Sequence, residues 1–221
     1  GCTKVPAKVS SETYAAYLHG NYRFSEQWEL TAGVRYTQED KNVRWEQFNE
    51  PNDPATAAAL EAATGLPLTQ APGALFGAIN YDRIKDDRDE DDVSPTVGIN
   101  FFPNEQVMIY AKYARGFKSG GYNAEFMTGG LDFFEYEDES VDNYELGIKS
   151  TLFDDTLQLN ATGFVSKFDD YQVFQFLTNS QGATTLQLTN AGQATTQGIE
   201  IETVYVPTDR LRFMLNATWL D

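Results

Sequence analysis

The chain has 221 residues, with 33 acidic and 16 basic side chains, a formal net charge of −17 and a pI near 4.3. Such an acidic chain is repelled by a polyanion, so nucleic acid is excluded as a partner. Aromatic residues make up 14% of the chain, which argues against general disorder. No run approaches the roughly 18 apolar residues of a transmembrane helix, which excludes a helical membrane protein. A β-barrel stays possible, because its strands face the membrane only at every second residue.

The chain has one cysteine, Cys2, and one histidine, His19. No internal disulfide can form, so Cys2 is either a free thiol or pairs with a cysteine outside these residues. A single histidine leaves little material for histidine-based catalysis or multi-histidine metal sites, and we expect His19 to be structural. We therefore expect no enzyme, no metal site and no cofactor. The first six residues lack the apolar segment of a signal peptide, so a mature chain or a fragment is expected.

Four segments share one pattern in chain order: 22–36, 101–113, 151–164 and 204–219. Each has an aromatic or apolar strand end, a short stretch of turn-forming residues and then apolar/polar alternation. The turn centres are 25–27, 103–105, 154–155 and 207–209. After the first turn, apolar side chains from Trp28 to Tyr36 alternate with polar ones such as Glu29 and Arg35. A period of two sustained in this way indicates a β-strand.

Extending the pattern predicts eight strands, at 12–24, 28–44, 91–102, 106–118, 139–153, 156–175, 187–206 and 210–221. Four connections are tight turns, and three are long: 45–90, 119–138 and 176–186. Short turns on one side and long loops on the other are typical of an outer-membrane barrel, whose short turns are periplasmic. Aromatic residues at the strand ends beside the turns fit a membrane-interface girdle. A soluble β-sandwich would explain the alternation, but not the strand length or the unequal connections.

Two segments of the first long connection allow a functional and a plain interpretation. The Ala-rich run 54–64 predicts a short helix with Asp53 as its cap, either a lid or, as the residues favour, a surface helix. The run 85–92 is rich in carboxylates, which suit either calcium or a solvated acidic rim. Its spacing does not match an EF-hand, so the rim is favoured. Such carboxylates could also meet divalent ions that bridge lipopolysaccharide.

Several stretches resemble the barrels of TonB-dependent receptors. They are YAKYARGFKSGGYN at 110–123, VDNYELGIKS at 141–150, NAG at 190–192 with QGIEIE at 197–202, and LTAGVRYTQED at 30–40. Gly147 and Gly198 lie inside these strands, where glycine marks a close approach or a bend in the wall. Glu145 and Lys149 are four residues apart and therefore face one side, the lumen of a large barrel.

The resemblance implies an all-β, antiparallel transmembrane barrel of about 22 strands filled by a plug domain. Residues 1–221 would form about eight strands of its wall, with the plug and the C-terminal strands outside this chain. The implied function is active import of a scarce nutrient, most of all a ferric siderophore, across the outer membrane of a Gram-negative bacterium. TonB would drive it through the missing plug. A passive porin is the alternative, and a barrel enzyme would need a nucleophile and base that these residues do not offer.

The resemblance places ligand binding in the extracellular loops and the upper lumen. Arg115 and Lys118 are cations at a strand top and suit an anionic iron chelate, although pairing with a nearby carboxylate is favoured. The loop 119–138 carries candidate ligand contacts that suit hot spots: Tyr122, Asn123, Phe126, Phe133, Phe134 and Tyr136. Packing of that loop against its neighbours is the favoured alternative. Beyond the ligand and TonB, the expected partners are outer-membrane lipid and lipopolysaccharide.

Overall fold

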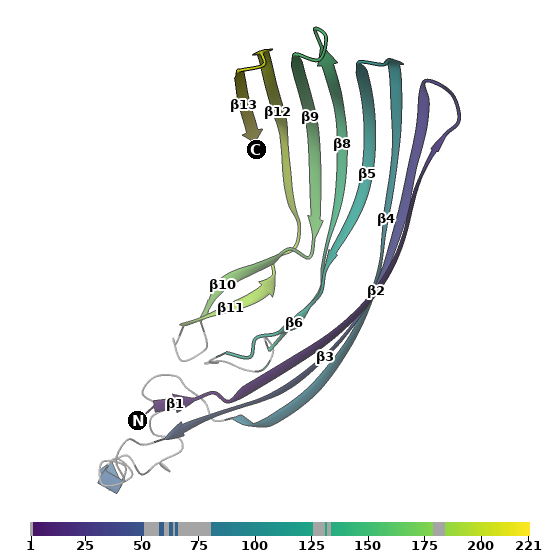
Figure 1. The fold of residues 1–221 in the computed structure, drawn as a ribbon. Helices are drawn as coiled ribbons and strands as arrows, with labels where there is room; N and C mark the ends of the chain where they lie inside the picture. The colour runs from purple at the N-terminus through teal and green to yellow at the C-terminus, as the bar shows by residue number, and fades with distance from the viewer. Residues whose placement is uncertain are drawn as a thin grey trace.

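The computed structural model describes residues 2–50, 58, 59, 62, 63, 65, 81–125, 131, 134–178 and 184–221. Within them, nine strands form one antiparallel sheet in the order β1-β3-β4-β5-β8-β9-β12-β13, with β2 paired to β3. Two short hairpins, β6–β7 and β10–β11, are separate sheets. Figure 1 shows the large sheet as a tall curved wall whose strands β2, β3 and β4 extend far beyond the others at the lower end.

The strands of the wall are long, as the alternation predicted. Their bounds are β1 (Cys2–Lys4), β2 (Ala7–Arg23), β3 (Trp28–Glu50), β4 (Tyr81–Asn104), β5 (Val107–Lys118), β8 (Glu139–Leu152), β9 (Leu157–Asp169), β12 (Ala194–Thr208) and β13 (Leu211–Leu220). The small hairpins consist of β6 (Gly121–Tyr122) with β7 (Glu135–Tyr136) and β10 (Gln172–Thr178) with β11 (Thr184–Asn190). All eight predicted strands are present, and the four tight turns lie together at the upper rim in Figure 1.

Two predicted strands are wrong in one respect, because each is broken where it leaves the wall. The strand expected at 156–175 ends at Asp169, and the one expected at 187–206 enters the wall only at Ala194. Asp170 and Gly192 have φ values of 55° and 86°, a left-handed conformation that a strand cannot contain. The segments beyond these bends pair with each other as the hairpin β10–β11, so part of the expected loop 176–186 is also strand.

The long connection 45–90 is shorter than predicted, because β3 continues to Glu50 and β4 begins at Tyr81. The acidic run 85–92 is therefore strand and not loop, and it pairs with residues 37–44 of β3. Of the predicted helix at 54–64, the described residues 58–59 and 62–63 are helical. The rest of that segment lies outside the described residues.

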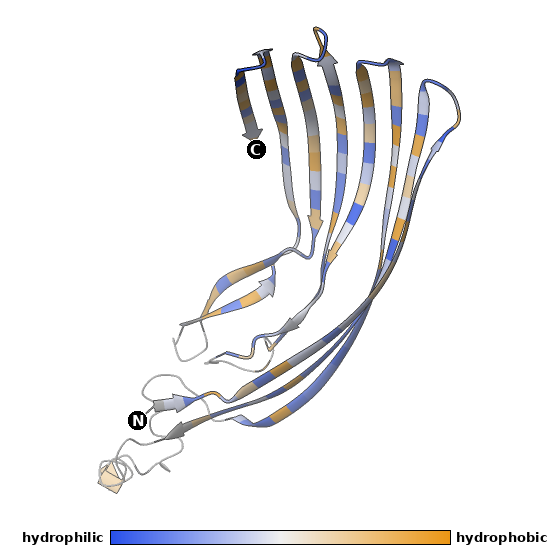
Figure 2. Ribbon diagram, in the orientation of Figure 1, coloured by the Kyte–Doolittle hydropathy of each residue, from blue (hydrophilic) through white to orange (hydrophobic). Residues whose placement is uncertain are grey.

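Register fixes which side chains share a face of the wall. Following Tyr22 across the sheet gives Leu30, Ile99, Ala111, Leu146, Gly163, Ile199 and Trp219. The large apolar members of this row are exposed, and the alternation of colour along the strands is visible in Figure 2. A face this apolar and this exposed has no protein core to cover it, which is the arrangement of a barrel wall facing lipid.

The apolar belt also gives the tilt of the strands. It runs from Trp28 to Tyr36 on β3 and from Leu152 to Tyr144 on β8, although Trp28 is level in register with Ile148. From β3 to β8 the belt therefore shifts by four residues, which is about 14 Å along the strands. The two strands are three spacings apart, which is also about 14 Å across the sheet, so the strands tilt by roughly 45°. Strands of outer-membrane barrels tilt by about 35–45°. The belt on β3 then has a height of roughly 20 Å.

The opposite, inward face is polar and closely packed. Tyr110 crosses over Gly147 to reach the hydroxyl of Thr162 at 2.9 Å, from β5 over β8 to β9. A Cβ at Gly147 would lie 2.5 Å from the Tyr110 ring, so the predicted close approach is confirmed, with an aromatic ring as the approaching group. Glu145 accepts from Asn143 at 2.6 Å and pairs with Lys112 at 3.4 Å, whereas Lys149 lies over the Tyr110 ring at 5.6 Å.

Candidate ligand site and its loop scaffold

A polar hollow of about 570 Å³ opens on the inward face. It lies just to the loop side of the level where the outward apolar belt ends on β3, which is toward the lower end in Figure 1. Alternation places Arg35, Thr37 and Glu39 of β3 on this face, and their neighbours Ser94 and Thr96 come from β4. Lys118 and Ser119, at the end of β5, close the other side. The hollow therefore offers two cations, one carboxylate and several hydroxyls to a molecule in the lumen.

The charges at this hollow differ in how strongly they are held. Arg35 is exposed, and its Nε donates to the Thr37 hydroxyl at 3.1 Å. Lys118 pairs with Glu139 at 3.9 Å but remains 58% exposed. Burial acts to raise the pKa of Glu39, yet hydrogen bonds from Ser11 and Ser119 together with the Lys41 ammonium lower it overall. Glu39 is therefore a carboxylate, while the two cations keep donors free for an anion.

The two predicted basic residues lie in different places. Lys118 borders the hollow and has the carboxylate neighbour that the pairing interpretation expected. Arg115 shares the outward alternation of Tyr113 and is level with Asp142 on β8. Arg115 is among the residues that line the hollow, although the alternation along β5 assigns its side chain to the outward face. Arg35 was missed as a candidate, although its polar position between Val34 and Tyr36 identified it as inward-facing.

A layer of ion pairs lies next to the hollow on its loop side. Lys41 donates to the Ser119 hydroxyl at 2.6 Å and also to the carbonyl of Gly120, whose amide donates to Glu90 at 3.1 Å. Arg88 pairs with Glu90 and with Glu137, and its side chain is 14% exposed. Charges from β3 and β4 thus hold both ends of the loop that leaves β5. Within the acidic run 85–92, the inward-facing residues Arg88 and Glu90 belong to this layer. The run is part of β4, so it does not form the rim of a loop.

An aromatic cluster forms the next layer and is the most buried part of the described structure. Trp45 and Val43 are each 1% exposed, and Phe134 is 4% exposed. The Trp45 ring centroid lies 5.3 Å from those of Tyr81 and Phe134, and the indole N–H donates to the carbonyl of Glu125 at 3.3 Å. The loop from β5 to β8 therefore packs onto β3 and β4 and forms a small hydrophobic core, on the loop side of the apolar belt.

The hairpin β10–β11 is joined to the same loop by side-chain amides. Asn123 donates to the carbonyl of Leu188 at 2.8 Å and accepts from its amide at 3.0 Å. Gln172 donates to the carbonyls of Ser119 and Glu137 at 3.1 and 2.9 Å. Asn190 accepts from the amide of Glu137 at 2.8 Å. These bonds replace a regular strand ladder where the chain leaves the wall.

The predicted loop residues are placed accordingly. Phe134 and Asn123 are committed to the packing just described, and Tyr136 covers Gly121 within the hairpin β6–β7. The Tyr122 hydroxyl is buried without a partner among the described atoms, and burial, with Asp86 and Glu135 nearby, raises its pKa to about 12. Phe126 and Phe133 lie outside the described residues. For all six, a ligand contact stays a prediction.

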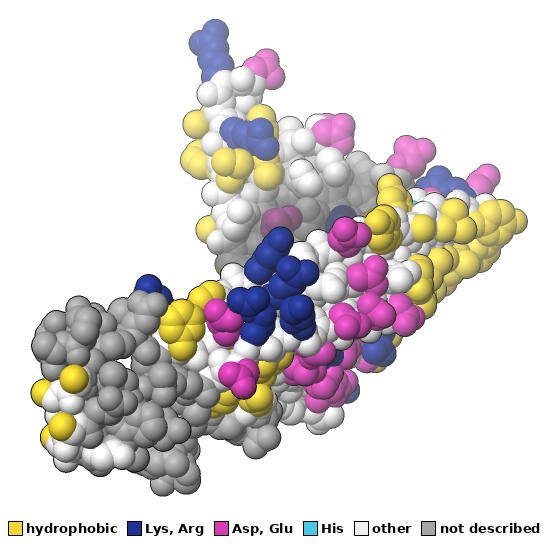
Figure 3. Space-filling model, turned by 90° about the horizontal axis from the view of Figure 1, so that it is seen from below, with side chains coloured by type: hydrophobic (Ala, Val, Ile, Leu, Met, Phe, Trp, Pro, Cys, Tyr) yellow, Lys and Arg dark blue, Asp and Glu magenta, His cyan; other side chains and the backbone are white. Residues whose placement is uncertain are grey.

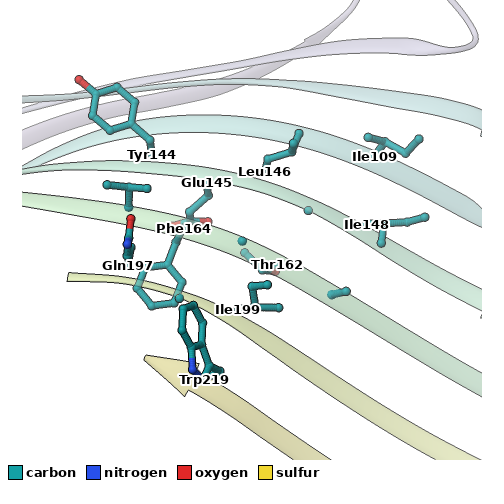
Figure 4. Close-up of a pocket in the computed structure, with 15 residues that line it drawn as sticks. Ile109, Tyr144, Glu145, Leu146, Ile148, Thr162, Phe164, Gln197, Ile199 and Trp219 are labelled. Carbon is teal, nitrogen blue, oxygen red and sulfur yellow. The ribbon is translucent and has the colours of Figure 1, made fainter. Parts of the chain in front are cut away.

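Other features of the described part do not compete with this hollow. A second hollow of about 870 Å³ lies around Ala161 and Gly163, but its side chains Leu146, Ile148 and Ile199 belong to the outward apolar face (Figure 4). No group of His, Cys, Asp and Glu among the described residues has the arrangement of a metal site. No helix among them is long and apolar enough to cross a membrane.

An exposed apolar belt, tilted strands, short turns at one rim and packed loops at the other define the wall of a transmembrane β-barrel with a polar lumen. The family model described as "TonB dependent receptor-like, beta-barrel" matches residues 3–221, and the chain belongs to that family. Members of this family are receptors of the Gram-negative outer membrane.

Individual relatives agree with this family. A pesticin receptor of Yersinia enterocolitica is 26% identical over 194 residues, which cover 88% of this chain and 24% of the relative. The ferric yersiniabactin uptake receptor FyuA of Yersinia pestis has a TM-score of 0.72 at 20% identity and covers 99% of this chain and 28% of that chain. The siderophore receptor PiuA of Acinetobacter baumannii has a TM-score of 0.67 at 20% identity, covering 97% and 26%. The chain thus spans about a quarter of each relative.

Proposed function

We propose that this chain forms part of the wall of an outer-membrane receptor that binds a scarce nutrient and imports it actively, with a ferric siderophore as the first candidate. TonB would supply the energy through a plug domain that lies outside these residues. In this proposal the chemistry is binding and release, and no covalent bond is broken. The family membership supports a receptor of this kind, and a passive porin is not favoured by it.

The observation that carries the proposal is the inward hollow between β3, β4 and the end of β5. In a chain with a net charge of −17, Arg35 and Lys118 still present cations to the lumen there. Iron chelates often carry negative charge, and charge-assisted hydrogen bonds to such a ligand are about twice as strong as neutral ones. The layers of ion pairs and aromatic rings border the hollow on its loop side.

The names of the relatives point in the same direction. A ferric yersiniabactin uptake receptor and a siderophore receptor share this fold along nearly the whole chain. Their identity of 20% supports the fold and leaves the ligand open. We therefore infer the ligand class from the luminal cations together with these names.

Growth and uptake measurements test the proposal. A strain that lacks the receptor would carry the full-length gene, and uptake of radioactive iron would be measured with each of a set of ferric chelates under iron limitation. We expect uptake of one chelate that stops when the proton gradient is collapsed. Uptake that persists without the gradient would instead indicate passive diffusion.

Two substitutions connect uptake to the hollow. Arg35→Gln and Lys118→Gln each remove a cation that we expect to contact the anion, so affinity for the chelate should fall about tenfold or more for each. Arg210→Gln is the matched control, because Arg210 lies in the turn between β12 and β13 at the opposite rim. Equal affinity in all four proteins would contradict a role for this hollow.

A further inference from the structure

The polar groups of the inward hollow differ in whether they already have partners. Glu39 accepts from the Ser119 hydroxyl, and the side chain of Glu39 is only 16% exposed. Arg35 uses its Nε to donate to Thr37, and its two terminal nitrogens have no partner among the described residues. The Thr96 hydroxyl also has none among them. A molecule in the hollow therefore meets a free guanidinium fork and a free hydroxyl.

The two cations of the hollow come from different strands. Arg35 lies on β3 and Lys118 at the end of β5, with β4 between them, so their backbones are at least about 10 Å apart. Lys118 is 58% exposed, although Glu139 lies 3.9 Å away. A guanidinium binds a carboxylate through two parallel hydrogen bonds, whereas an ammonium acts as a point charge. The hollow thus suits a ligand with two separated carboxylates.

The hollow offers little surface to an aromatic ring. Phe117 is the one aromatic residue among the described residues that line it, and the alternation along β5 assigns its ring to the outward face. On the luminal side, β4 contributes Ser94 and Thr96, and Gly116 has no side chain. A Cβ at Gly116 would already lie 3.0 Å from the Val141 side chain. A ring in the hollow would therefore meet hydroxyls and cations instead of a stacking partner.

Iron chelates of different chemistry present different outer surfaces. In a tris-catecholate both oxygens of each ring bind the iron, so the ring edges face outward. The core of a trihydroxamate complex is neutral and gives the two cations no anionic partner. A hydroxycarboxylate chelate keeps carboxylate oxygens and hydroxyl groups on its surface. Those are the acceptors and donors that a free guanidinium fork, an ammonium and a threonine hydroxyl match.

We propose that the hollow binds a ferric hydroxycarboxylate, with one carboxylate on Arg35, a second on Lys118 and a hydroxyl group at Thr96. This assignment rests on the proposed function, because it takes the hollow as the ligand site, and it narrows the ligand to a chelate with an oxygen-rich surface. A ring-bearing chelate would instead stack on Tyr17, which is level with Arg35 on the inward face and 79% exposed. Tyr17 does not line the hollow, so it separates the two ligand chemistries.

Cations elsewhere at the loop end provide a control for simple electrostatic attraction. Figure 3 looks onto that end and shows Lys and Arg side chains gathered in one group beside Asp and Glu. Arg44 borders a different hollow together with Asp86 and Asp87, so an anion there meets carboxylates as well. Arg44→Gln removes the same charge as Arg35→Gln and leaves the proposed site intact. A loss of binding that follows net charge alone would appear equally in both variants.

A binding titration with the full-length receptor in detergent tests the ligand class. The probes are ferric citrate, the ferric complex of dicitryl-diaminobutane, a ferric tris-catecholate and a ferric trihydroxamate. We expect one of the two hydroxycarboxylates to bind at least about tenfold more tightly than the other classes. Arg35→Lys keeps the charge but loses the fork and should weaken that binding about tenfold, and Thr96→Val should weaken it about fivefold. Arg44→Gln and Tyr17→Ala should stay within about twofold of the unmodified receptor.

Several results would overturn the ligand class: tightest binding of the catecholate with a loss in Tyr17→Ala, tightest binding of the trihydroxamate, equal or absent binding of all probes, or equal losses in Arg35→Gln and Arg44→Gln. Uptake of the same probes by cells separates this inference from the transport proposal. Import of a catecholate or hydroxamate that stops when the proton gradient is collapsed would overturn the ligand class and leave active transport standing. Uptake of a hydroxycarboxylate that persists without the gradient would contradict active transport and leave the ligand class standing.

Discussion

Replacement of Trp45 by Ala should release the extracellular loop while leaving the barrel wall intact. The side chain is 1% exposed and contacts the rings of Tyr81 and Phe134, and its indole N–H donates to the carbonyl of Glu125. Truncation of a buried tryptophan to alanine costs about 3–5 kcal/mol. The effect should remain local, because Trp45 lies nine residues beyond Tyr36, where the apolar belt ends.

The expected magnitude follows from that cost. A loss of about 3–5 kcal/mol raises the population of the open loop by roughly two to three and a half orders of magnitude. Hydrogen exchange reports such local opening directly. The amide of Asn123 donates to the carbonyl of Phe134 at 2.7 Å and is protected only while the loop is packed. Peptides that contain β6 and β7 should therefore exchange about 100 to 4,000 times faster, or at the unprotected rate.

Two comparisons make the result decisive. Peptides from β8 should exchange as in the unmodified receptor, because their partners β5 and β9 lie in the wall. The control Trp219→Ala removes the same side chain at a position 60% exposed on the outward face, and it should leave the loop unchanged. Acceleration below tenfold in the loop, or equal acceleration in β8, would refute the idea that the aromatic cluster holds the loop independently of the wall.

Three further outcomes are expected. Gly147→Ala should destabilise the barrel by about 1–3 kcal/mol in urea unfolding, because the Tyr110 ring occupies the position of the new Cβ, whereas Gly20→Ala, with open space around it, should be neutral. Asn123→Asp should detach the hairpin β10–β11 in hydrogen exchange, since a carboxylate cannot donate to the Leu188 carbonyl. Burial and then Asp86 raise the pKa of Glu135 above its usual 4.5, so the folded loop favours the protonated form and should loosen as pH rises through that raised pKa. Fluorine NMR of Trp45 should show this transition in the unmodified receptor and not in Glu135→Gln.

The wall could be predicted from the sequence because alternation is a local property. Each strand of the belt repeats apolar and polar residues with a period of two, and a shift of one residue would expose the wrong face to lipid. The positions of the tight turns followed from the same pattern. Bulges near Pro103 and Pro207 moved two turn centres slightly, since proline cannot donate to the ladder.

The loop scaffold could not be predicted, because it depends on contacts between residues far apart in the chain. Trp45 meets Phe134, and Asn123 meets Leu188, and nothing in either local sequence selects these partners. The aromatic residues of the loop at 119–138 suited both a ligand surface and a small core. The structure uses at least Phe134 for the core, at 4% exposure. The number of aromatic residues in a loop does not distinguish a ligand surface from a small core. The contact between Phe134 and Trp45 of β3 does distinguish them, and it is seen only in the structure.

Charge placement shows how one strand pair serves two surroundings. On the inward face of β3 and β4, Lys41 donates to the carbonyl of Gly120 in the loop, and Arg88 pairs with Glu90 of β4 and with Glu137 of the loop. On the outward face of the same strands, Arg44 and Lys85 have no such partners among the described residues. Because both pairs lie on the same two strands and differ in the parity of their positions, sequence spacing assigns one pair to the inward face and the other to the outward face, whereas the loop contacts of the inward pair are seen only in the structure.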